Sequence, residues 1–432
     1  MKKAISYLLV YAILMALLVV ASFTANADEK NIATIGDTSG TTGDCTWKIE
    51  GTTLTICGSG KMGSYDYNGA DIAPWRNAGI TEAVIEKGVT TIGKCAFYQC
   101  GNLKKVTIPD TVTGIGISAF YDCDSLKGLT IPDSVTIIGD YAFDCSRLTN
   151  VTIGNSVTSI GQYAFRNTSL TSVSIGNSVT SIGECAFYGC SRLTSVDIPD
   201  SVKSIGDYAF QRCTNLTSVT IGNSVTSIGQ YAFAACSSLM SVNIGNSVSN
   251  IRYNAFRDCK SLTSVNIPDS VGAIGEDAFR GCTNLTSVNI PNSVTWIGRM
   301  AFYDCTSLTS VTIPASVTSI IFKSFGYYTD ADFGTEMIDN DFTIYGYQNT
   351  AAETYAKDNG FKFVDLSGQP TEPSTQEPTA APTEPATTEP STKIIRGDTD
   401  GDGDVTVIDA TLIQRYLADI GTNVNGIGEP IE

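Results

Sequence analysis

The fold follows from a motif that is clearest in residues 183–198, which read Gly-Glu-Cys-Ala-Phe-Tyr-Gly-Cys-Ser-Arg-Leu-Thr-Ser-Val-Asp-Ile. The Ala-Phe pair recurs every 23 residues, with two steps of 22 around Phe165, and Ser324-Phe325 closes the series. A fixed period of this length is typical of a solenoid, whose turns bury their apolar faces against one another. Eleven of the 17 phenylalanines share this register and are expected to stack into one core: Phe97, Phe120, Phe143, Phe165, Phe187, Phe210, Phe233, Phe256, Phe279, Phe302 and Phe325.

Each repeat also contains Leu-x-x-Val-x-Ile, as in Leu193 to Ile198, and this alternation predicts a short, half-buried strand. A Pro-Asp or Gly-Asn turn follows, and then Val-x-x-Ile-Gly. We expect the glycine of Ile-Gly to supply a positive φ before the Phe segment. Arg252 and Ile321 replace that glycine, so the turn there should differ or be strained. About eleven units of 22–23 residues predict a mainly β solenoid.

The 13 cysteines follow the same period. A secreted chain with an odd number cannot pair all of them internally, so we favour a ladder of thiols hydrogen-bonded to loop backbone over a disulfide framework. Cys45 and Cys57 are equidistant from Gly51, and they could bridge if Gly51 centres a hairpin turn. The residues three positions before the repeat leucines form the expected ladder: Cys100, Cys123, Cys145, Asn167, Cys190, Cys213, Cys236, Cys259, Cys282 and Cys305.

Taken together, Ile-Gly-x-x-Ala-Phe-x-x-Cys-x-x-Leu-x-x-Val-x-Ile-Pro resembles the BspA-like class of bacterial leucine-rich repeats. The resemblance implies a right-handed leucine-rich-repeat solenoid over residues 80–366, including its C-terminal cap. Residues 28–79 would form the N-terminal cap with a β-hairpin, and a short helix is expected near residues 350–359. The family also implies a secreted or surface scaffold for adhesion or recognition, without catalysis.

One face of the predicted sheet is a nearly uncharged surface of hydroxyls and amides. This surface either binds a protein or polysaccharide, such as a host or cell-surface molecule, or simply keeps the sheet soluble. Tyrosines beside the core phenylalanines could stack on sugar rings, although packing is the commoner role. The residue between Val and Ile is Thr107, Thr130, Thr152, Ser174, Asp197, Thr220, Asn243, Asn266, Asn289 and Thr312.

Composition excludes several classes of function. The chain has no histidine, which removes Ser-His and Cys-His nucleophile pairs and zinc sites that use histidine. Its net charge of −17 argues against binding a nucleic-acid backbone or an anionic membrane.

The N-terminus resembles an export signal. Lys2 and Lys3 precede an apolar stretch, and Ala25-Asn26-Ala27 is a typical cleavage site. We therefore expect residues 1–27 to be a signal peptide that leaves a secreted protein without a stable membrane span. The alternative is a membrane anchor, because the apolar stretch is nearly long enough to span a bilayer.

The C-terminal part changes character twice. Residues 367–392 are rich in Pro, Thr and Glu and predict an extended linker. In residues 393–432, a loop places oxygen ligands in the order that calcium prefers, with Gly403 at its sharp turn, and predicts a small α calcium loop-helix module. The proposed Ca²⁺ ligands are Asp398, Asp400, Asp402, Asp404 through its carbonyl, Thr406 and Asp409.

Asp409 at the last loop position, followed by Ala410 to Leu417, resembles a dockerin repeat. Dockerins attach enzymes and accessory proteins to cohesin modules of a scaffold. By position, this resemblance assigns cohesin contacts to Val407, Ile408, Gln414 and Arg415. Dockerins normally carry two such units, and this chain departs from that pattern with one.

We therefore predict a secreted, non-catalytic recognition or adhesion protein, attached through calcium to a cohesin-bearing scaffold as an accessory component of a polysaccharide-degrading complex. The alternative is a stand-alone surface adhesin with a vestigial dockerin. A glycoside hydrolase is less favoured, because the acidic residues fall at turns and variable positions rather than as a pair flanking a cleft.

Overall fold

The computed structural model describes residues 38–69, 71–329 and 336–368. These residues belong to the first of two compact units, Met1–Gln369. The expected signal peptide, all but the start of the expected linker and the whole predicted calcium module lie outside the described residues. Among the described residues, no helix is long and apolar enough to cross a membrane.

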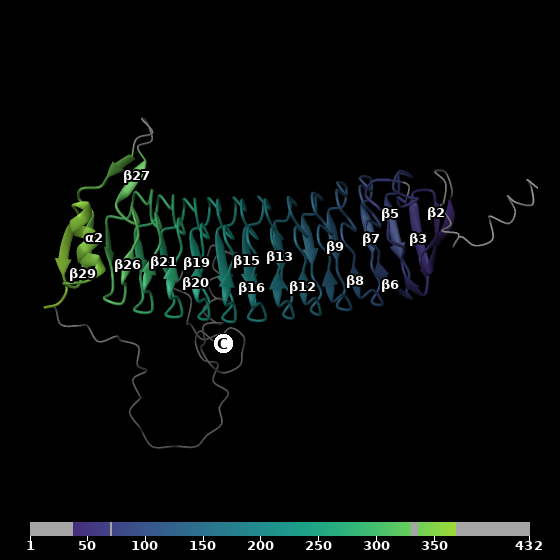
Figure 1. Ribbon diagram of the computed structural model, residues 1–432. Helices are drawn as coiled ribbons and strands as arrows, with labels where there is room; N and C mark the ends of the chain where they lie inside the picture. The colour runs from purple at the N-terminus through teal and green to yellow at the C-terminus, as the bar shows by residue number, and fades with distance from the viewer. Residues whose placement is uncertain (1–37, 70, 330–335, 369–432) are drawn as a thin grey trace, which may run out of the picture. The chain divides into compact units, whose positions relative to one another are not determined.

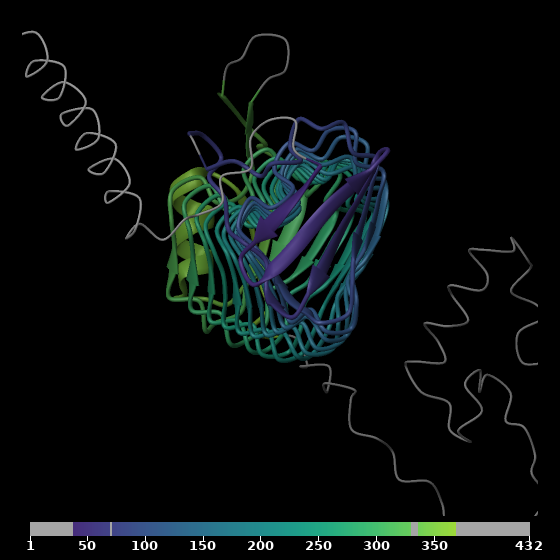
Figure 2. The same cartoon turned by 90° about the vertical axis from the view of Figure 1, so that its right-hand side faces the viewer.

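The described part of the chain is a parallel β-solenoid of about twelve turns, which confirms the predicted fold class and adds about one turn to the expected number. Figure 1 shows the turns stacked side by side in sequence order, and Figure 2 views the stack from its N-terminal end, where the cap strands lie across it. Each turn contributes one strand to each of two faces.

The Leu-x-x-Val-x-Ile segments form the first face, here called the Val-x-Ile face. Its strands alternate between exposed and buried residues, as predicted. The strands are β5 (Glu82–Ile85), β7 (Lys105–Thr107), β9 (Gly128–Thr130), β11 (Asn150–Thr152), β13 (Ser172–Ser174), β15 (Ser195–Ile198), β17 (Ser218–Ile221), β19 (Ser241–Asn243), β21 (Ser264–Asn266), β23 (Ser287–Asn289) and β25 (Ser310–Thr312).

The segments that end in Ile-Gly form the second face, a 12-stranded sheet here called the Ile-Gly sheet. Its strands are mostly two residues long and pair in register from turn to turn. They are β4 (Gly60–Lys61), β6 (Val89–Ile92), β8 (Gly114–Ile115), β10 (Ile137–Ile138), β12 (Ser159–Ile160), β14 (Ser181–Ile182), β16 (Ser204–Ile205), β18 (Ser227–Ile228), β20 (Asn250–Ile251), β22 (Ala273–Ile274), β24 (Trp296–Ile297) and β26 (Ser319–Ile320).

The repeat phenylalanines form one continuous stack between the faces. Consecutive rings lie 4.8–5.4 Å apart and are nearly parallel. Trp75 covers Phe97 at the N-terminal end, where its indole Nε1 donates to the Ala96 carbonyl over 2.7 Å. Phe342 covers Phe325 at the other end. Both ends of the aromatic core are therefore capped by further aromatic rings.

The Ile-Gly glycines serve a different purpose from the one expected. None of them has a positive φ; that conformation falls two residues later, for example at Ser118 and Tyr141. A Cβ built on Gly116 would lie 2.7 Å from the carbonyl carbon of Gly93 in the preceding turn. These positions need glycine because neighbouring backbones approach too closely for a side chain.

Arg252 replaces one of these glycines, and the expected irregularity is visible there. Strands β18 and β20 are paired through one residue pair only, Ile228 with Ile251. The next turn contact, from the Tyr231 amide to the Tyr253 carbonyl, is 3.1 Å long, whereas most equivalent bonds are 2.8–2.9 Å. At Ile321 the amide still donates to Ile297 over 2.9 Å, so that turn keeps its bond.

The N-terminal cap is built from β1 (Ser39–Thr42), β2 (Cys45–Glu50) and β3 (Thr53–Gly58). Strand β3 pairs in parallel with β5, the first strand of the Val-x-Ile face. The β2–β3 hairpin pairs Cys45 with Gly58, and Thr46 with Cys57. The expected facing of Cys45 and Cys57 is therefore wrong. The turn is centred between Gly51 and Thr52, and this shift of register puts the two thiols on opposite faces.

The C-terminal end contains the one helix of the described residues. An antiparallel hairpin projects from the last turn (Figure 1), and two further strands and the helix close the stack. These elements are β27 (Tyr327–Thr329), β28 (Glu336–Ile338), β29 (Thr343–Gly346), α2 (Ala351–Asn359) and β30 (Lys362–Asp365).

Candidate ligand-binding face

The Val-x-Ile face presents the polar row that the sequence predicts. All ten residues between Val and Ile, from Thr107 to Thr312, are exposed. The alternation of the strands explains this, because the flanking Val and Ile side chains point into the core. Asn289 donates to the Asn266 side chain of the preceding turn over 3.2 Å, so part of the row is ordered by its own hydrogen bonds.

Threonines directly before these strands hold successive turns together. The Thr149 hydroxyl donates to the Lys127 carbonyl over 2.9 Å, and Thr217 donates to Thr194 over 3.0 Å. A matching series runs beside the Ile-Gly sheet, where Thr136 donates to the Thr113 carbonyl over 3.0 Å. These hydroxyls are already used within the solenoid, so the rows between Val and Ile are the better candidates for contacting a ligand.

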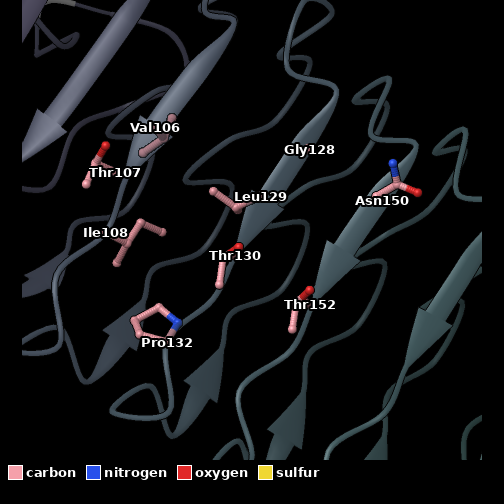
Figure 3. A pocket seen from close by; sticks show the side chains of 9 residues that line it. All are labelled: Val106, Thr107, Ile108, Gly128, Leu129, Thr130, Pro132, Asn150 and Thr152. Atoms are coloured by element: carbon pink, nitrogen blue, oxygen red, sulfur yellow. The ribbon is translucent and has the colours of Figure 1, made fainter.

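The Val-x-Ile face is hollowed near its N-terminal end (Figure 3). The cavity, of about 460 Å³, lies over β7, β9 and β11. Strands β7 and β9 belong to different hydrogen-bonded sheets, and Gly128 contributes no side chain to fill the space between them. The cavity is lined by Val106, Thr107, Ile108, Gly128, Leu129, Thr130, Pro132, Asn150 and Thr152.

This cavity combines hydroxyl and amide groups with apolar surface. The side chains of Thr107, Thr130 and Thr152 are exposed, while Val106 and Ile108 are half-buried. Such a mixture suits a ligand that buries apolar area and forms a few hydrogen bonds. The polar row was predictable from the repeat. The cavity was not, because it depends on where neighbouring strands lose their pairing.

The cysteines do form a ladder inside the turns. The Cys123 thiol donates to the Phe97 carbonyl over 3.1 Å, and Cys213 donates to Phe187 over 3.3 Å. Cys190, Cys236, Cys259, Cys282 and Cys305 make the same bond. All thirteen cysteines fall within the described ranges, and each is a free thiol there.

The expected ladder needs one correction, at the two shortened repeats. Ser146 and Thr168 occupy the ladder position, and their hydroxyls donate to the carbonyls of Phe143 and Phe165. Cys145 and Asn167 lie one residue earlier, at a positive-φ position outside the ladder. The ladder was predicted by counting three residues back from each repeat leucine. In the two 22-residue repeats this count is one too many, because the residue that they lack lies between the ladder position and the leucine.

Burial makes the ladder thiols poor nucleophiles. It raises the pKa of Cys100, Cys190 and Cys236 to about 12, and the pKa of Cys123 and Cys213 lies well above its usual value for the same reason. The thiolate is the reactive form of cysteine, and these groups stay protonated at neutral pH. The ladder is therefore structural.

We expect native protein to react with a thiol reagent quickly at Cys57 and more slowly at Cys145, because both are half-buried but burial and Asp144 raise the pKa of the Cys145 thiol. After unfolding without reductant, all thirteen thiols should react. The measurement is a spectrophotometric thiol count in buffer and in guanidinium. Replacing Cys57 by Ser should remove one fast-reacting thiol and leave the rest unchanged. A count near zero in denaturant would show that the cysteines are oxidised instead.

The tyrosine rows are mostly packing elements. Tyr98 stacks on Tyr121 with ring centroids 4.8 Å apart, and Tyr141 stacks on Tyr163 at 4.7 Å. The Arg166 guanidinium lies over the Tyr163 ring at 4.9 Å. Ring faces that are covered in this way are not available to stack on a sugar, so the rows as a whole are not a sugar platform.

In residues 38–69, 71–329 and 336–368, no group of three or more acidic or thiol side chains could hold a metal ion. The predicted calcium ligands, Asp398 to Asp409, and the predicted cohesin contacts, Val407, Ile408, Gln414 and Arg415, lie outside these ranges.

Comparison with known proteins points to one family for the repeats. The family described as "BspA type Leucine rich repeat region" matches residues 75–194, 158–282 and 249–332, which is more than half of the chain. A leucine rich cell surface protein from Faecalibacterium prausnitzii A2-165 is 30% identical, with a TM-score of 0.34, and the match covers 65% of this chain and 95% of that one. A leucine-rich repeat protein from Bacteroides ovatus ATCC 8483 is 27% identical, with a TM-score of 0.38, and covers 63% and 94%.

A different, shorter match concerns an enzyme. Endoglucanase A of Acetivibrio thermocellus is 41% identical over 61 residues, which are 14% of this chain and 11% of that protein. The chain therefore spans only about a tenth of the length of this relative.

Proposed function

Since the chain belongs to the BspA-type leucine-rich repeat family, we propose that its solenoid is a secreted, non-catalytic scaffold for recognition or adhesion. The exposed polar row on the Val-x-Ile face carries this proposal, because it offers hydroxyls and amides on a rigid support. The buried, protonated thiols and the lack of histidine support a role without catalysis.

The second part of the proposal concerns attachment. Residues 398–409 carry the oxygen ligands of a calcium loop, and the following segment resembles a dockerin helix, so the C-terminal module would bind Ca²⁺ and dock onto a cohesin of a scaffold protein. The 61-residue match to an endoglucanase supports an association with polysaccharide breakdown. Because it covers about a tenth of that enzyme, it supports a shared module rather than shared catalysis.

The test is calcium titration of the full secreted chain, residues 28–432, followed by capture on immobilised cohesins with calcium or EDTA. We expect calcium-dependent capture, which the double variant Asp398→Ala/Asp400→Ala loses because two carboxylate ligands are gone. Asp269→Asn, in an exposed turn of the solenoid, is the matched control and should be captured normally.

A second variant separates metal binding from docking. Replacing Gln414 and Arg415 by Ala should abolish capture while the calcium affinity stays the same. Calcium binding without capture by any cohesin would favour the alternative, a stand-alone surface adhesin. Release of sugar from cell-wall polysaccharides by the pure chain would contradict the non-catalytic assignment.

A further inference from the structure

The Ile-Gly sheet departs from its Ser-Ile pattern in two groups of turns, one before β12 and one after β18. Strands β12, β14, β16, β18 and β26 are Ser-Ile, but the three consecutive turns between β18 and β26 carry Asn250, Ala273 and Trp296 at the serine position. In the second of these turns, Gly272 replaces the threonine that usually precedes the strand. Arg252, the residue that replaces an Ile-Gly glycine, lies in the first of these turns. This group differs from the N-terminal one because it coincides with a replaced Ile-Gly glycine and with an exposed indole, and this combination points to a local function.

These departures surround a cavity of about 520 Å³ on the outer surface of the sheet. Trp296 and Tyr253 line it and are each 37% exposed, although large aromatic side chains elsewhere in the repeats are mostly covered. The small residue Ala273 lies between the turns of Asn250 and Trp296 and leaves the space open. The size falls within the range of small-molecule sites.

Tyr253 is not part of the tyrosine stacks. It occupies the position that follows the Ile-Gly glycine, where neighbouring turns carry Gln230 and Glu276. Its ring meets Tyr231 edge-on, at 81°, whereas Tyr208 and Tyr231 are stacked nearly parallel at 8°. Asn254 takes the place where the stack would continue, and this frees the Tyr253 ring to face outward.

The polar groups around the two rings are balanced in charge. Arg252 pairs with Asp207 over 3.5 Å, and Arg299 pairs with Glu276 over 3.3 Å. The amides of Gln230 and Asn250 complete the lining. Amide side chains both donate and accept hydrogen bonds, and Glu276 accepts them. A ligand with hydroxyl groups, which also donate and accept, matches this rim, and the paired charges favour a neutral one.

We propose that this cavity, between Tyr253 and Trp296 on the Ile-Gly sheet, binds a neutral polysaccharide, with the apolar face of a pyranose ring against the indole and sugar hydroxyls on Gln230, Asn250 and Glu276. Aromatic rings supply apolar contact area of defined orientation, and the polar rim selects the hydroxyls. The alternative, a proline-rich peptide, fits less well because prolines offer no backbone donor for Glu276. This inference deepens the proposed recognition role and rests on it.

The test uses the full secreted chain in native gels that contain a soluble neutral polysaccharide: galactomannan, xyloglucan or mixed-linkage β-glucan. We expect at least one of them to retard the wild-type protein. Trp296→Ser, which introduces the residue of the following turn, Ser319, should weaken the affinity about tenfold, as expected for the loss of one ring contact. Trp296→Phe should recover part of the affinity, because it keeps an aromatic ring.

Two matched controls separate the site from the surface in general. Ile137→Ser removes an exposed apolar residue from the same position of a distant turn, and Phe322→Ala removes an exposed ring outside the cavity. Both should be retarded like the wild type. Circular dichroism melts should show that Trp296→Ser is folded, since Trp296 is exposed.

The proposal is overturned if none of the three polysaccharides retards the wild-type chain, or if Trp296→Ser is retarded as strongly as the wild type. It is also overturned if a synthetic peptide of residues 369–392 binds at Trp296 while the polysaccharides do not. The gels contain EDTA and no cohesin, so a failure here is distinct from a failure of calcium-dependent docking.

Discussion

Replacing Phe210 by Ala should lower the free energy of unfolding by about 3–5 kcal/mol, the usual cost of removing a buried aromatic side chain. Phe210 is fully buried and stacks between Phe187 and Phe233, with centroid distances of 5.1 and 5.2 Å. Its removal leaves a gap in the continuous core and deprives both neighbouring rings of a contact. The turns on either side cannot close this gap, because their spacing is set by the backbone hydrogen bonds between strands.

Phe322→Ala is the matched control for this prediction. Phe322 is also a phenylalanine of the repeats, but it is 58% exposed. We expect its replacement to change the free energy of unfolding by no more than about 0.5 kcal/mol, as for most surface positions. Guanidinium unfolding followed by circular dichroism measures both variants. Equal losses for Phe210→Ala and Phe322→Ala would show that the aromatic stack does not carry the stability of the solenoid.

The Phe210 variant should also change the shape of the unfolding curve. Stability in a solenoid is approximately a sum of terms for single turns and for contacts between neighbours. A weak interface in the middle of the array lets the two halves unfold separately, so we expect a broader transition or two resolved steps. A single, equally steep transition at lower guanidinium concentration would mean that the turns unfold together despite the gap.

The periodicity explains why the fold could be predicted so fully. The phenylalanine, leucine, valine and isoleucine positions specify which side chains are buried in each turn, and the stacking of identical turns follows from them. The prediction gave the wrong physical reason for the glycines of the Ile-Gly segments. Gly116 and its equivalents look like positive-φ residues in sequence, but they are needed because of the neighbouring backbone, which lies a whole repeat away along the chain.

Local register was harder to predict than architecture. Cys45 and Cys57 are symmetric about Gly51 in sequence, yet a shift of half a residue in the turn centre moves them to opposite faces. Similarly, the position of a one-residue deletion within a repeat cannot be read from spacing alone. The structure locates it after Ser146 and Thr168, which are buried at the ladder position and donate to the phenylalanine carbonyl of their own turn rather than of the preceding one.

Only the part of the candidate sites that recurs in every turn could be predicted from the sequence. The polar row follows from the alternation of the strands. The two cavities arise where turns differ from one another: one where β7 and β9 are not paired, the other where Arg252, Ala273 and Trp296 replace the usual residues. Sequence did single out Arg252 as an exception, and that signal could have drawn attention to the second cavity.

Replacing Arg166 by Ala should also cost about 3–5 kcal/mol, because it leaves a buried carboxylate without its partner. Asp144 is completely buried, and Arg166 binds it through two bonds, Nε to Oδ1 at 2.9 Å and Nη2 to Oδ2 at 2.6 Å. The Arg166 guanidinium also covers the rings of Tyr163 and Tyr141. The Cys145 thiol donates to Asp144 Oδ1 over 3.3 Å, but a thiol is a weak donor and cannot replace the charge.

Arg147→Ala provides a closely matched control. Arg147 also pairs with an aspartate of the preceding turn, Asp124, over 3.0 Å, but the two side chains are 65% and 49% exposed. Exposed pairs contribute about 0–1 kcal/mol, so this variant should unfold almost like the wild type. The two variants thus remove the same residue type from the same kind of contact and differ mainly in burial.

A double variant separates the cost of the unpaired charge from the loss of packing. Asp144→Leu together with Arg166→Met replaces the buried pair by apolar side chains, and buried ion pairs can often be exchanged in this way at little cost. We therefore expect the double variant to be more stable than Arg166→Ala alone, as measured by guanidinium unfolding. If instead Arg166→Ala unfolds like Arg147→Ala, Asp144 must reach water or another donor, and the buried pair does not contribute the stability expected here.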